Sequence, residues 1–320
     1  RALMLARPDR TLRTDMIAEV MQYGYINSPN SAFNEIYQVP PASVTSWRDG
    51  RTKKSRYWTP DFETKINISY EDALETTKEL IEAAVSRRLI SERPLGSFLS
   101  GGYDSTVVTA YMAKLMKEKV QTYSIGFHSA QFNEAHHAKQ VASFLGTNHH
   151  EEILSPDPAL IVEKISHVLD QPFADSSIVP TYLLAKFARE NLIVALGGDG
   201  GDEVFGGYDR YLATPVMQKM NPFLGLARGG LNLLGKQSFG NTRKVNRVGS
   251  QLSPKSSLAA RYSSILSLTQ PEELSMLLNS NIYSNAAETT YVNQFTEGKI
   301  SSFDRMIRSD FAAYLPGDLL

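Results

Sequence analysis

The sequence predicts an α/β fold, a parallel sheet with helices on both faces, followed by a helical C-terminal part. Two observations predict this fold. Apolar runs of strand length alternate with helical patterns over residues 95–196, and glycine-rich segments follow two of those runs. Ligands of such sheets bind outside the carboxyl ends of the strands. We therefore expect the functional residues within 99–105, 125–133 and 197–208.

The elements can be assigned in order from the spacing of apolar residues. A long amphipathic helix is expected over residues 70–91, where apolar residues recur at close to 3.6-residue spacing. The elements expected after it are strand 95–99, helix 105–119, strand 120–127, helix 134–145, strand 148–154, helices 159–169 and 178–190, strand 192–196, and helices 258–268 and 271–278. Gly146 is expected at a helix C-cap.

Residues 1–60 differ from the rest because turn-forming residues such as Pro40-Pro41 and Asp49-Gly50 interrupt them repeatedly. They are too irregular for a stable domain of their own. We interpret them as the end of a larger domain followed by a connector, and residues 61–320 as the main domain.

Composition excludes several classes of protein. The formal net charge of -1 gives no field that would attract nucleic acid or an anionic membrane, and no apolar run reaches the length of a membrane span. The chain has no cysteine, which excludes disulfides, a Cys-ligated zinc and a cysteine nucleophile within it. We expect a cytoplasmic protein with no nucleic-acid or membrane partner.

The first segment with chemical character is the glycine–serine loop, residues 99–105, between an expected strand and an expected helix. Gly101 and Gly102 let the backbone approach an anion, and the following helix N-terminus favours negative charge. An acid such as Asp104 suits a phosphate site only if a cation such as Mg²⁺ lies between them. The alternative is a Gly-Gly turn that caps a helix. The spacing matches neither the Walker nor the Rossmann glycine motif.

The second segment is the acidic loop, residues 197–207, which holds six glycines and three acids. Such a sequence at the end of a strand is typical of a polyphosphate or metal site. Asp199 and Asp202 could hold Mg²⁺, orient an attacking group or meet a cationic group of the substrate. The alternative is a flexible surface loop.

These two loops carry a resemblance to a known family. Ser-Gly-Gly-x-Asp-Ser after a strand resembles the PP-loop of ATP pyrophosphatases, which cleave ATP between the α- and β-phosphates. The acidic loop resembles a signature of the asparagine synthetase family. Further segments resemble that family in the same order along the chain: Phe132–Glu134, Leu145–Thr147 with His150, Asp170–Ser177, Pro180–Leu184 and Tyr314–Leu320.

The resemblance implies that both ends of the chain are truncated. Tyr23–Ile26, Pro40-Pro41 and Tyr57-Trp58 look like the end of a class II glutaminase domain and its connector. That domain begins with a cysteine nucleophile in the family, so its main part would lie upstream. A basic Lys-Val-Asp-Arg segment would follow Leu320. Ammonia for the reaction would come from the glutaminase domain, and the full-length protein could form a homodimer.

The resemblance also implies residue roles, with ATP and Mg²⁺ as the bound species. Leu99 would line the adenine side of the site, and Ile125 would contact the adenosine. Asp199 would be catalytic in forming the acyl-adenylate. The remaining roles are phosphate binding by Ser100, Gly101, Gly102 and Ser105, backbone contacts to ATP from Gly197 and Gly198, and Mg²⁺ binding by Asp104 and Asp202.

The reaction implied is that of a glutamine-hydrolysing asparagine synthase. ATP would adenylate the side-chain carboxylate of aspartate, and ammonia would then form the amide, with release of AMP and pyrophosphate. Two departures from the family pattern keep another carboxylate acceptor, on a glycan or peptide, as an alternative: Gln171 replaces the usual Glu, and Gly197 the usual Ser. A tRNA-modifying enzyme and a non-catalytic nucleotide-binding regulator are further alternatives.

The histidine pairs raise the question of a metal site. His136-His137 are adjacent on an expected helix, whereas a zinc-binding helix places two histidines four residues apart. His149-His150 belong to an expected strand. We expect surface or strand-end polar roles for all four.

Overall fold

The computed structural model describes Leu3, Ala6 and residues 10–128, 135–154, 157–212, 257–278, 295 and 300–320. The chain forms two compact units. Unit 1 comprises Arg1–Lys65, Asp170–Asp175 and Glu203–Leu320, and unit 2 comprises Ile66–Leu169 and Ser176–Asp202. These units are defined by packing, and they do not coincide with the predicted domains 1–60 and 61–320. The domain division at residue 60 stays a prediction.

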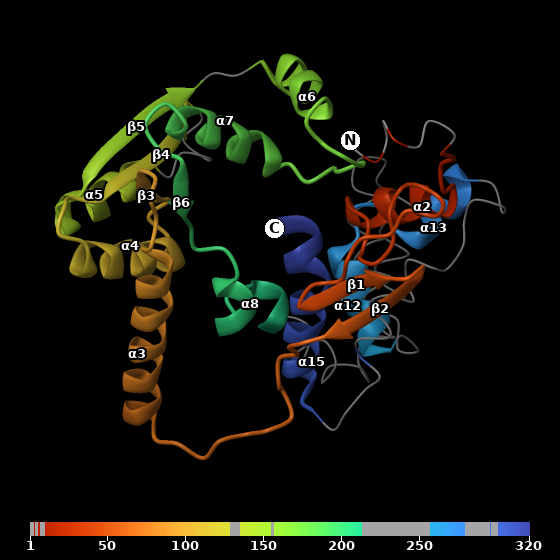
Figure 1. Cartoon of the computed structure of the whole chain (residues 1–320), viewed down its shortest axis with the longest axis horizontal. Helices are drawn as coiled ribbons and strands as arrows, with labels where there is room; N and C mark the ends of the chain where they lie inside the picture. The colour runs from red at the N-terminus through yellow and green to blue at the C-terminus, as the bar shows by residue number, and fades with distance from the viewer. Residues whose placement is uncertain are drawn as a thin grey trace, which may run out of the picture. The chain divides into compact units, whose positions relative to one another are not determined.

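Unit 2 is built on a parallel sheet of four strands, as the sequence predicts (Figure 1). The strands are β3 (Leu95–Phe98), β4 (Gln121–Phe127), β5 (Asn148–Leu154) and β6 (Val194–Leu196), in the spatial order β5-β4-β3-β6. The central strand β3 pairs with β4 on one side and with β6 on the other, so that Ser97 lies between Thr122 and Leu196.

The helices of unit 2 are α3 (Tyr70–Arg88), α4 (Tyr103–Leu115), α5 (Ala135–Leu145), α6 (Pro158–Ser166) and α7 (Ile178–Ala188). They cover both faces of the sheet. The Ser97 hydroxyl lies 2.8 Å from that of Thr109 in α4, whereas the next residue, Phe98, packs against a cluster that includes Ala188 of α7. Neighbouring strand residues point to opposite faces, so α4 and α7 lie on opposite faces, which confirms the predicted fold class.

The predicted bounds differ from the observed ones mainly at helix ends. The helix expected over 105–119 begins at Tyr103 and ends at Leu115. Leu192, expected to start a strand, donates its amide to the Ala188 carbonyl and so extends the last turn of α7. Its side chain packs in a cluster with Tyr123 beneath the sheet. Gly146 has a φ of +68°, in agreement with the expected C-cap. The motif residues Phe132–Glu134 lie outside the described part of the chain.

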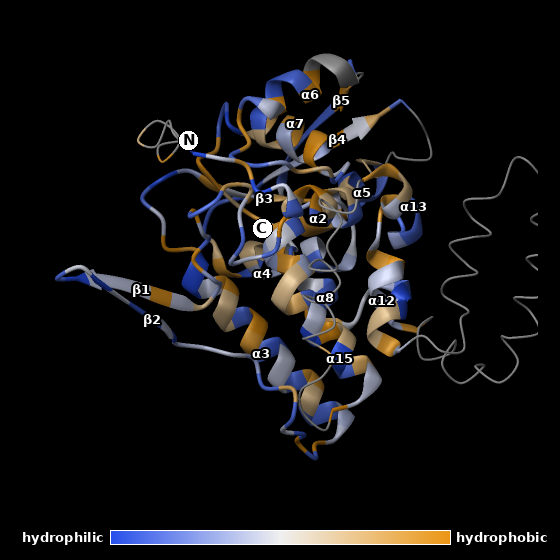
Figure 2. Cartoon of the chain, turned by 90° about the vertical axis from the view of Figure 1, so that its right-hand side faces the viewer, coloured by the Kyte–Doolittle hydropathy of each residue, from blue (hydrophilic) through white to orange (hydrophobic). Residues whose placement is uncertain are grey.

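The N-terminal part of unit 1 contains a helix and a hairpin that the sequence analysis does not predict. Helix α2 spans Asp15–Tyr23, and strands β1 (Ser43–Arg48) and β2 (Arg51–Arg56) pair antiparallel. Asp49 and Gly50 join the strands with φ of +51° and +74°, the signs that a tight hairpin turn requires. The hairpin is missed because its strands lack alternating apolar residues, and Figure 2 shows that β2 carries no hydrophobic residue.

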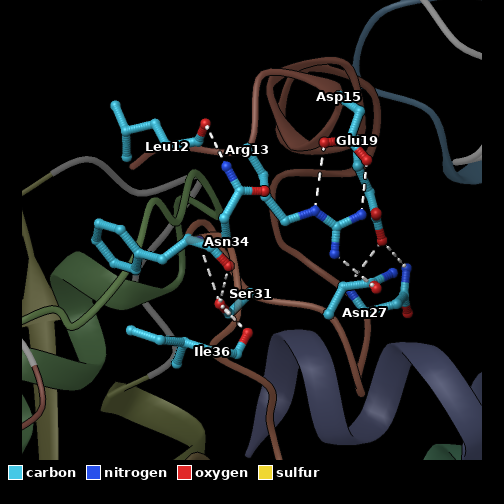
Figure 3. Close-up of polar contacts among 10 residues, drawn as sticks. Leu12, Arg13, Asp15, Glu19, Asn27, Ser31, Asn34 and Ile36 are labelled. Atoms are coloured by element: carbon cyan, nitrogen blue, oxygen red, sulfur yellow. Dashed lines mark hydrogen bonds and ion pairs between the residues drawn. The ribbon is translucent and has the colours of Figure 1, made fainter. Parts of the chain in front are cut away.

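Polar contacts order the chain around α2 (Figure 3). Arg13 forms an ion pair with Asp15 at 2.6 Å, and its other guanidinium nitrogen donates to Asn30. Glu19, which is buried, accepts hydrogen bonds at 2.8 Å from both the backbone and the side-chain nitrogen of Asn27. Burial raises the pKa of Glu19 above its usual range.

The C-terminal part of unit 1 is helical, as expected. Its elements are α12 (Leu258–Leu266), α13 (Pro271–Leu277), α15 (Ser302–Ser309) and the π-helix η2 (Asp310–Leu319). Tyr211, Tyr262 and Met306 form the centre of its core, and each is fully buried. Within the described residues, no helix is both long enough and apolar enough to cross a membrane.

Candidate active site

The order of the strands places the two predicted loops beside each other. From β3 the chain proceeds outward to β4 and β5, and it then returns to add β6 on the opposite side of β3. Figure 1 shows β3 and β6 side by side. The change of direction between them makes a topological switch point, and ligands of such sheets usually bind there, outside the carboxyl ends of the strands. The glycine–serine loop leaves β3 at this point, and the acidic loop leaves β6.

The glycine–serine loop has a backbone that only glycine suits at its centre. Gly101 has a φ of +85°, and a Cβ there would stand 2.7 Å from both the Ala138 nitrogen and the His137 Cβ of α5. The Ser100 and Ser105 hydroxyls lie 3.0 Å apart, and Ser100 also accepts the amide of Gly102 at 3.2 Å. The loop is therefore held in one shape by α5 on one side and by its two serines on the other.

The glycine–serine loop leads directly into the N-terminus of α4. Gly102 is the N-cap residue and supplies no side-chain cap, so it leaves room for an anionic ligand near the first-turn amides. The helix dipole adds positive potential at the same place. Asp104 lies in this first turn, where a carboxylate competes with a phosphate unless a cation joins them.

The acidic loop lies in close contact with this first turn. A Cβ on Gly198 would stand 2.6 Å from the Ser105 nitrogen, and one on Gly201 would collide with the Asp104 carboxyl group. Neither position has space for a side chain. The glycines of the acidic loop thus allow the end of β6 to approach the start of α4.

This approach brings two of the predicted acids into electrostatic contact. Burial, and secondly the nearby charge of Asp202, raise the pKa of Asp104 above its usual range. Like charges held this close make the ligand-free site unfavourable and favour a bound cation. Asp202 lies in α8 (Gly201–Phe205), the short helix that follows the turn.

The residues present fit a magnesium ion that is shared with a phosphate chain. Among the described residues, no cluster of three or more His, Asp or Glu side chains could hold a metal alone. Mg²⁺ is commonly bound by one or two carboxylates together with substrate phosphates, and it rarely has a cage made only of protein. Asp104 and Asp202 supply that number of carboxylates beside the N-terminus of α4, where the helix dipole favours anions.

Asp199 and Gly197 are linked by a steric relationship. Asp199 is exposed, and a Cβ on Gly197 would stand 2.6 Å from one of its carboxylate oxygens. The Asp199 side chain therefore occupies space that any residue larger than glycine would take at 197. This explains how Gly197, which departs from the family pattern, affects the conformation of the predicted catalytic acid.

The two predicted adenosine-contacting residues differ in their availability. Leu99 is 1% exposed and packs against Ala138 and Ala142 of α5, so neither its side chain nor its main chain is open to a ligand in this conformation. Ile125 lies in β4, two residues before the strand ends, and is partly exposed. The histidines His149 and His150 have hydrogen-bonding partners on β4, namely Thr122, Ser124 and Gln121, consistent with polar roles in the sheet.

Residues beyond the acidic loop form a polar network to which the sequence analysis assigns no role. The Tyr208 hydroxyl donates to Glu203 at 2.8 Å, and Arg210 forms an ion pair with Asp310 at 2.8 Å. A local signal exists for Arg210, because it stands between aromatic residues in Tyr-Asp-Arg-Tyr and can stack on them. No local signal identifies Asp310, which lies 100 residues from Arg210.

Comparison with known proteins gives a consistent family. The family model for asparagine synthase matches residues 76–320. The chain is 30% identical over 213 residues to "Asparagine synthetase [glutamine-hydrolyzing] 1" of Bacillus subtilis, a match that covers 66% of this chain and 33% of that protein. It is 34% identical over 206 residues to a putative asparagine synthetase of Methanocaldococcus jannaschii, covering 63% of this chain and 39% of that protein.

The chain thus spans about a third of the length of these curated relatives. Among solved structures, it is similar to an NH3-dependent NAD synthetase from Campylobacter jejuni at 16% identity. That match covers 44% of this chain and 61% of that one, with a TM-score of 0.29. This overlap is too low to support a conclusion.

Proposed function

The chain belongs to the asparagine synthase family, and on that premise we propose that its site binds ATP and uses it to activate a carboxylate for amidation. The observation that carries the proposal is the close approach of the acidic loop to the first turn of α4. It joins a place for phosphates to a pair of carboxylates suited to Mg²⁺. Aspartate is the proposed acceptor and ammonia, made from glutamine, the proposed nitrogen donor.

The glycine–serine loop is the proposed phosphate site. The amides of Gly101 and Gly102 and the hydroxyls of Ser100 and Ser105 would bind phosphate oxygens. Donors of this kind, held by a rigid loop, need little rearrangement when the ligand binds. The adenosine would contact the side chain of Ile125, and Leu99, buried against α5, would support the adenine side of the site from beneath. Gly197 and Gly198 would offer backbone contacts from the acidic loop.

Asp104 and Asp202 are the proposed ligands of Mg²⁺. When bound, the ion would neutralise the phosphate oxygens and the charge of the departing pyrophosphate. The two carboxylates would lose their mutual repulsion in the same event, so the ligand-free strain of the site would favour binding.

The proposed chemistry has two steps. The side-chain carboxylate of aspartate attacks the α-phosphorus of ATP, and the bond to the pyrophosphate oxygen breaks. Ammonia then attacks the acyl carbon of the adenylate, AMP leaves, and asparagine is released after loss of a proton. Positioning and charge stabilisation supply most of the rate enhancement in such transfers. Asp199 is the proposed catalytic acid group that supports adenylate formation.

A second candidate is amidation of another carboxylate, on a glycan or a peptide. The observation that favours it is the contact between Gly197 and Asp199, because the side chain of Asp199 adopts a position that a serine at 197 would not allow. Gln171, which replaces an acid of the family pattern, removes a charge from the segment before α7.

Product release measured on the full-length protein tests the proposal. With ATP, Mg²⁺ and ammonia, aspartate should cause release of AMP and pyrophosphate, and glutamate should not. Asp199→Ala should abolish the release, whereas Asp209→Ala, an exposed acid outside the site, should retain it. ATP binding without release on aspartate would shift the assignment to the second candidate.

A further inference from the structure

Asp310 is the centre of a buried network in unit 1. Its side chain is fully buried at the start of η2. A single oxygen, Oδ2, accepts from Arg210 Nη2 at 2.8 Å, from the Tyr211 hydroxyl at 2.7 Å and from the Tyr262 hydroxyl at 2.5 Å. These donors come from segments that are 48 to 100 residues away in the chain. The network therefore fixes Arg210 in both position and orientation.

Arg210 in turn packs against the rings of two tyrosines, Tyr208 and Tyr314. Its guanidinium carbon lies 3.7 Å from the centroid of the Tyr208 ring and 4.6 Å from that of Tyr314. A guanidinium between two tyrosine faces restrains both rings, because stacking and the ion pair must be satisfied together. The Tyr208 ring is therefore held by Arg210, and the Tyr208 hydroxyl is left to make a separate contact.

The Tyr208 hydroxyl donates to Glu203 at 2.8 Å. Glu203 is fully buried and lies in α8, directly after Asp202 in the chain. Burial, and secondly the hydrogen bond to Glu203, raise the pKa of Tyr208 far above its usual range, so the phenol stays a donor at any working pH. A continuous set of contacts thus leads from Asp310, through Arg210 and Tyr208, to the residue next to a proposed magnesium ligand.

The backbone around this set of contacts leaves little freedom for it to rearrange. Gly206 has a φ of +73°, and a Cβ there would stand 2.6 Å from the Phe303 ring of α15. The end of the acidic loop is therefore packed against the same C-terminal segment that carries Asp310. The chain from Glu203 to Arg210 is held at both its backbone and its side chains.

We propose that Asp310 is a positioning residue for the site: through Arg210 and Tyr208 it holds Glu203, and with it the turn of α8 that carries Asp202. The inference rests on the proposed ATP and Mg²⁺ site and identifies a determinant of its geometry about 100 residues away in sequence. Asp310 does not itself touch ATP or Mg²⁺ in this proposal. Its effect is on how well Asp202 is placed to bind the ion.

The test uses the Mg²⁺ dependence of ATP binding by the full-length protein, measured by calorimetry at a series of Mg²⁺ concentrations. Tyr208→Phe removes only the hydrogen bond to Glu203 and keeps the ring over Arg210. It should raise the Mg²⁺ concentration needed for half-maximal ATP affinity by roughly twofold to tenfold, the range for one lost hydrogen bond. Asp310→Asn should produce a shift in the same direction.

The controls separate positioning from plain stability. Asp15→Asn breaks an ion pair with Arg13 elsewhere in unit 1 and should leave the Mg²⁺ dependence unchanged. In Tyr208→Phe, hydrogen exchange should become faster in residues 197–207 and stay unchanged in α4. Asp310→Asn is judged only if it folds, because removing one partner of a buried pair can unfold a protein.

A melting temperature lowered in Tyr208→Phe, with unchanged Mg²⁺ dependence and unchanged exchange of residues 197–207, would overturn the inference. A different result would contradict the proposed function: ATP binding would depend on Mg²⁺ in the parent protein, but aspartate would cause no release of pyrophosphate. Absence of ATP binding in the parent protein would overturn both.

Discussion

Gly198 lies so close to α4 that a Cβ added to it would stand 2.6 Å from the backbone nitrogen of Ser105. Gly198→Ala should therefore separate the acidic loop from the first turn of α4, at a cost of about 1–3 kcal/mol in unfolding free energy. ATP affinity should fall with it, and titration calorimetry on the full-length protein would measure the loss. Gly102→Ala is the steric control, because its nearest neighbour would be the Ser100 hydroxyl at 3.3 Å and it should cost less stability. Equal stability losses in the two variants would contradict the packing described.

Gly101 and Gly146 provide a matched pair for the glycine–serine loop. Both have positive φ, +85° and +68°, but a Cβ on Gly101 would collide with α5, whereas one on Gly146 would meet nothing within 4 Å. Gly146→Ala should cost about 1 kcal/mol from backbone strain alone. Gly101→Ala should cost about 1–3 kcal/mol more, because the collision adds to the strain. Chemical denaturation of both variants measures the difference, and similar midpoints would show that α5 does not restrain the loop.

The sequence was most informative where local pattern and topology act together. The strands β4 and β5 begin and end within one residue of their expected bounds. β4 is rich in β-branched and aromatic residues, whereas β5 is mostly polar and its start is marked by the helix C-cap at Gly146. The site loops were recognisable because glycines and acids directly follow apolar runs of strand length. What the sequence could not supply was the pairing of β6 with β3, since strand order depends on contacts between residues about 100 positions apart.

The structural features that the sequence analysis did not predict were missed for different physical reasons. The hairpin of β1 and β2 has an Asp-Gly turn signal, but its strands are solvent-exposed and carry mostly polar residues, so periodicity gives no support. The network of Asp310 joins residues from three distant segments and has no local pattern. The C-terminal helix η2 contains Pro316, and proline disfavours a helix interior, so helix propensity does not predict η2.

Gly197 offers a test of how the acidic loop places its catalytic acid. In Gly197→Ser, the new Cβ would stand 2.6 Å from an Asp199 carboxylate oxygen, and this flexible side chain would rotate away. If the present rotamer is the productive one for this protein's acceptor, kcat for pyrophosphate release should fall by about tenfold or more, with the KM for ATP changed much less. Steady-state kinetics on the full-length protein measures both constants. A raised KM for ATP with unchanged kcat would instead assign residue 197 to nucleotide binding.

Substitution of Asp104 should have opposite effects on the stability of the ligand-free protein and on the binding of Mg²⁺ and ATP. Asp104→Asn removes one of two neighbouring like charges, so the ligand-free protein should melt at a higher temperature, by roughly 1–4 °C. The same variant should lose the stabilisation that Mg²⁺ and ATP give the parent protein, because a proposed ion ligand is gone. Thermal melts with and without Mg²⁺ and ATP measure both effects. A variant that is destabilised without ligand would contradict the electrostatic repulsion described.

The raised pKa of Asp318 predicts that the stability of the protein depends on pH near neutrality. It is 9% exposed, and burial, and secondly the neighbouring Asp175, raise its pKa to about 7. An unfolded aspartate titrates near pH 4, so between about pH 4 and pH 7 the folded protein keeps a proton that the unfolded chain has lost. The contribution of Asp318 to stability is therefore complete at low pH and is lost as pH rises through this window.

Asp318→Asn replaces the protonated carboxyl with a neutral amide of the same shape and should remove this pH dependence. The melting temperature of the variant relative to the parent should increase from pH 5 to about pH 7 and then level off towards pH 8. Asp61→Asn is the control of opposite sign, because backbone and Thr64 hydrogen bonds hold the pKa of Asp61 below its usual range. Its contribution is already complete above about pH 4, so its difference from the parent should be constant between pH 5 and pH 8. A constant difference for Asp318→Asn as well would mean that Asp318 is ionised throughout this range and does not share a proton with Asp175.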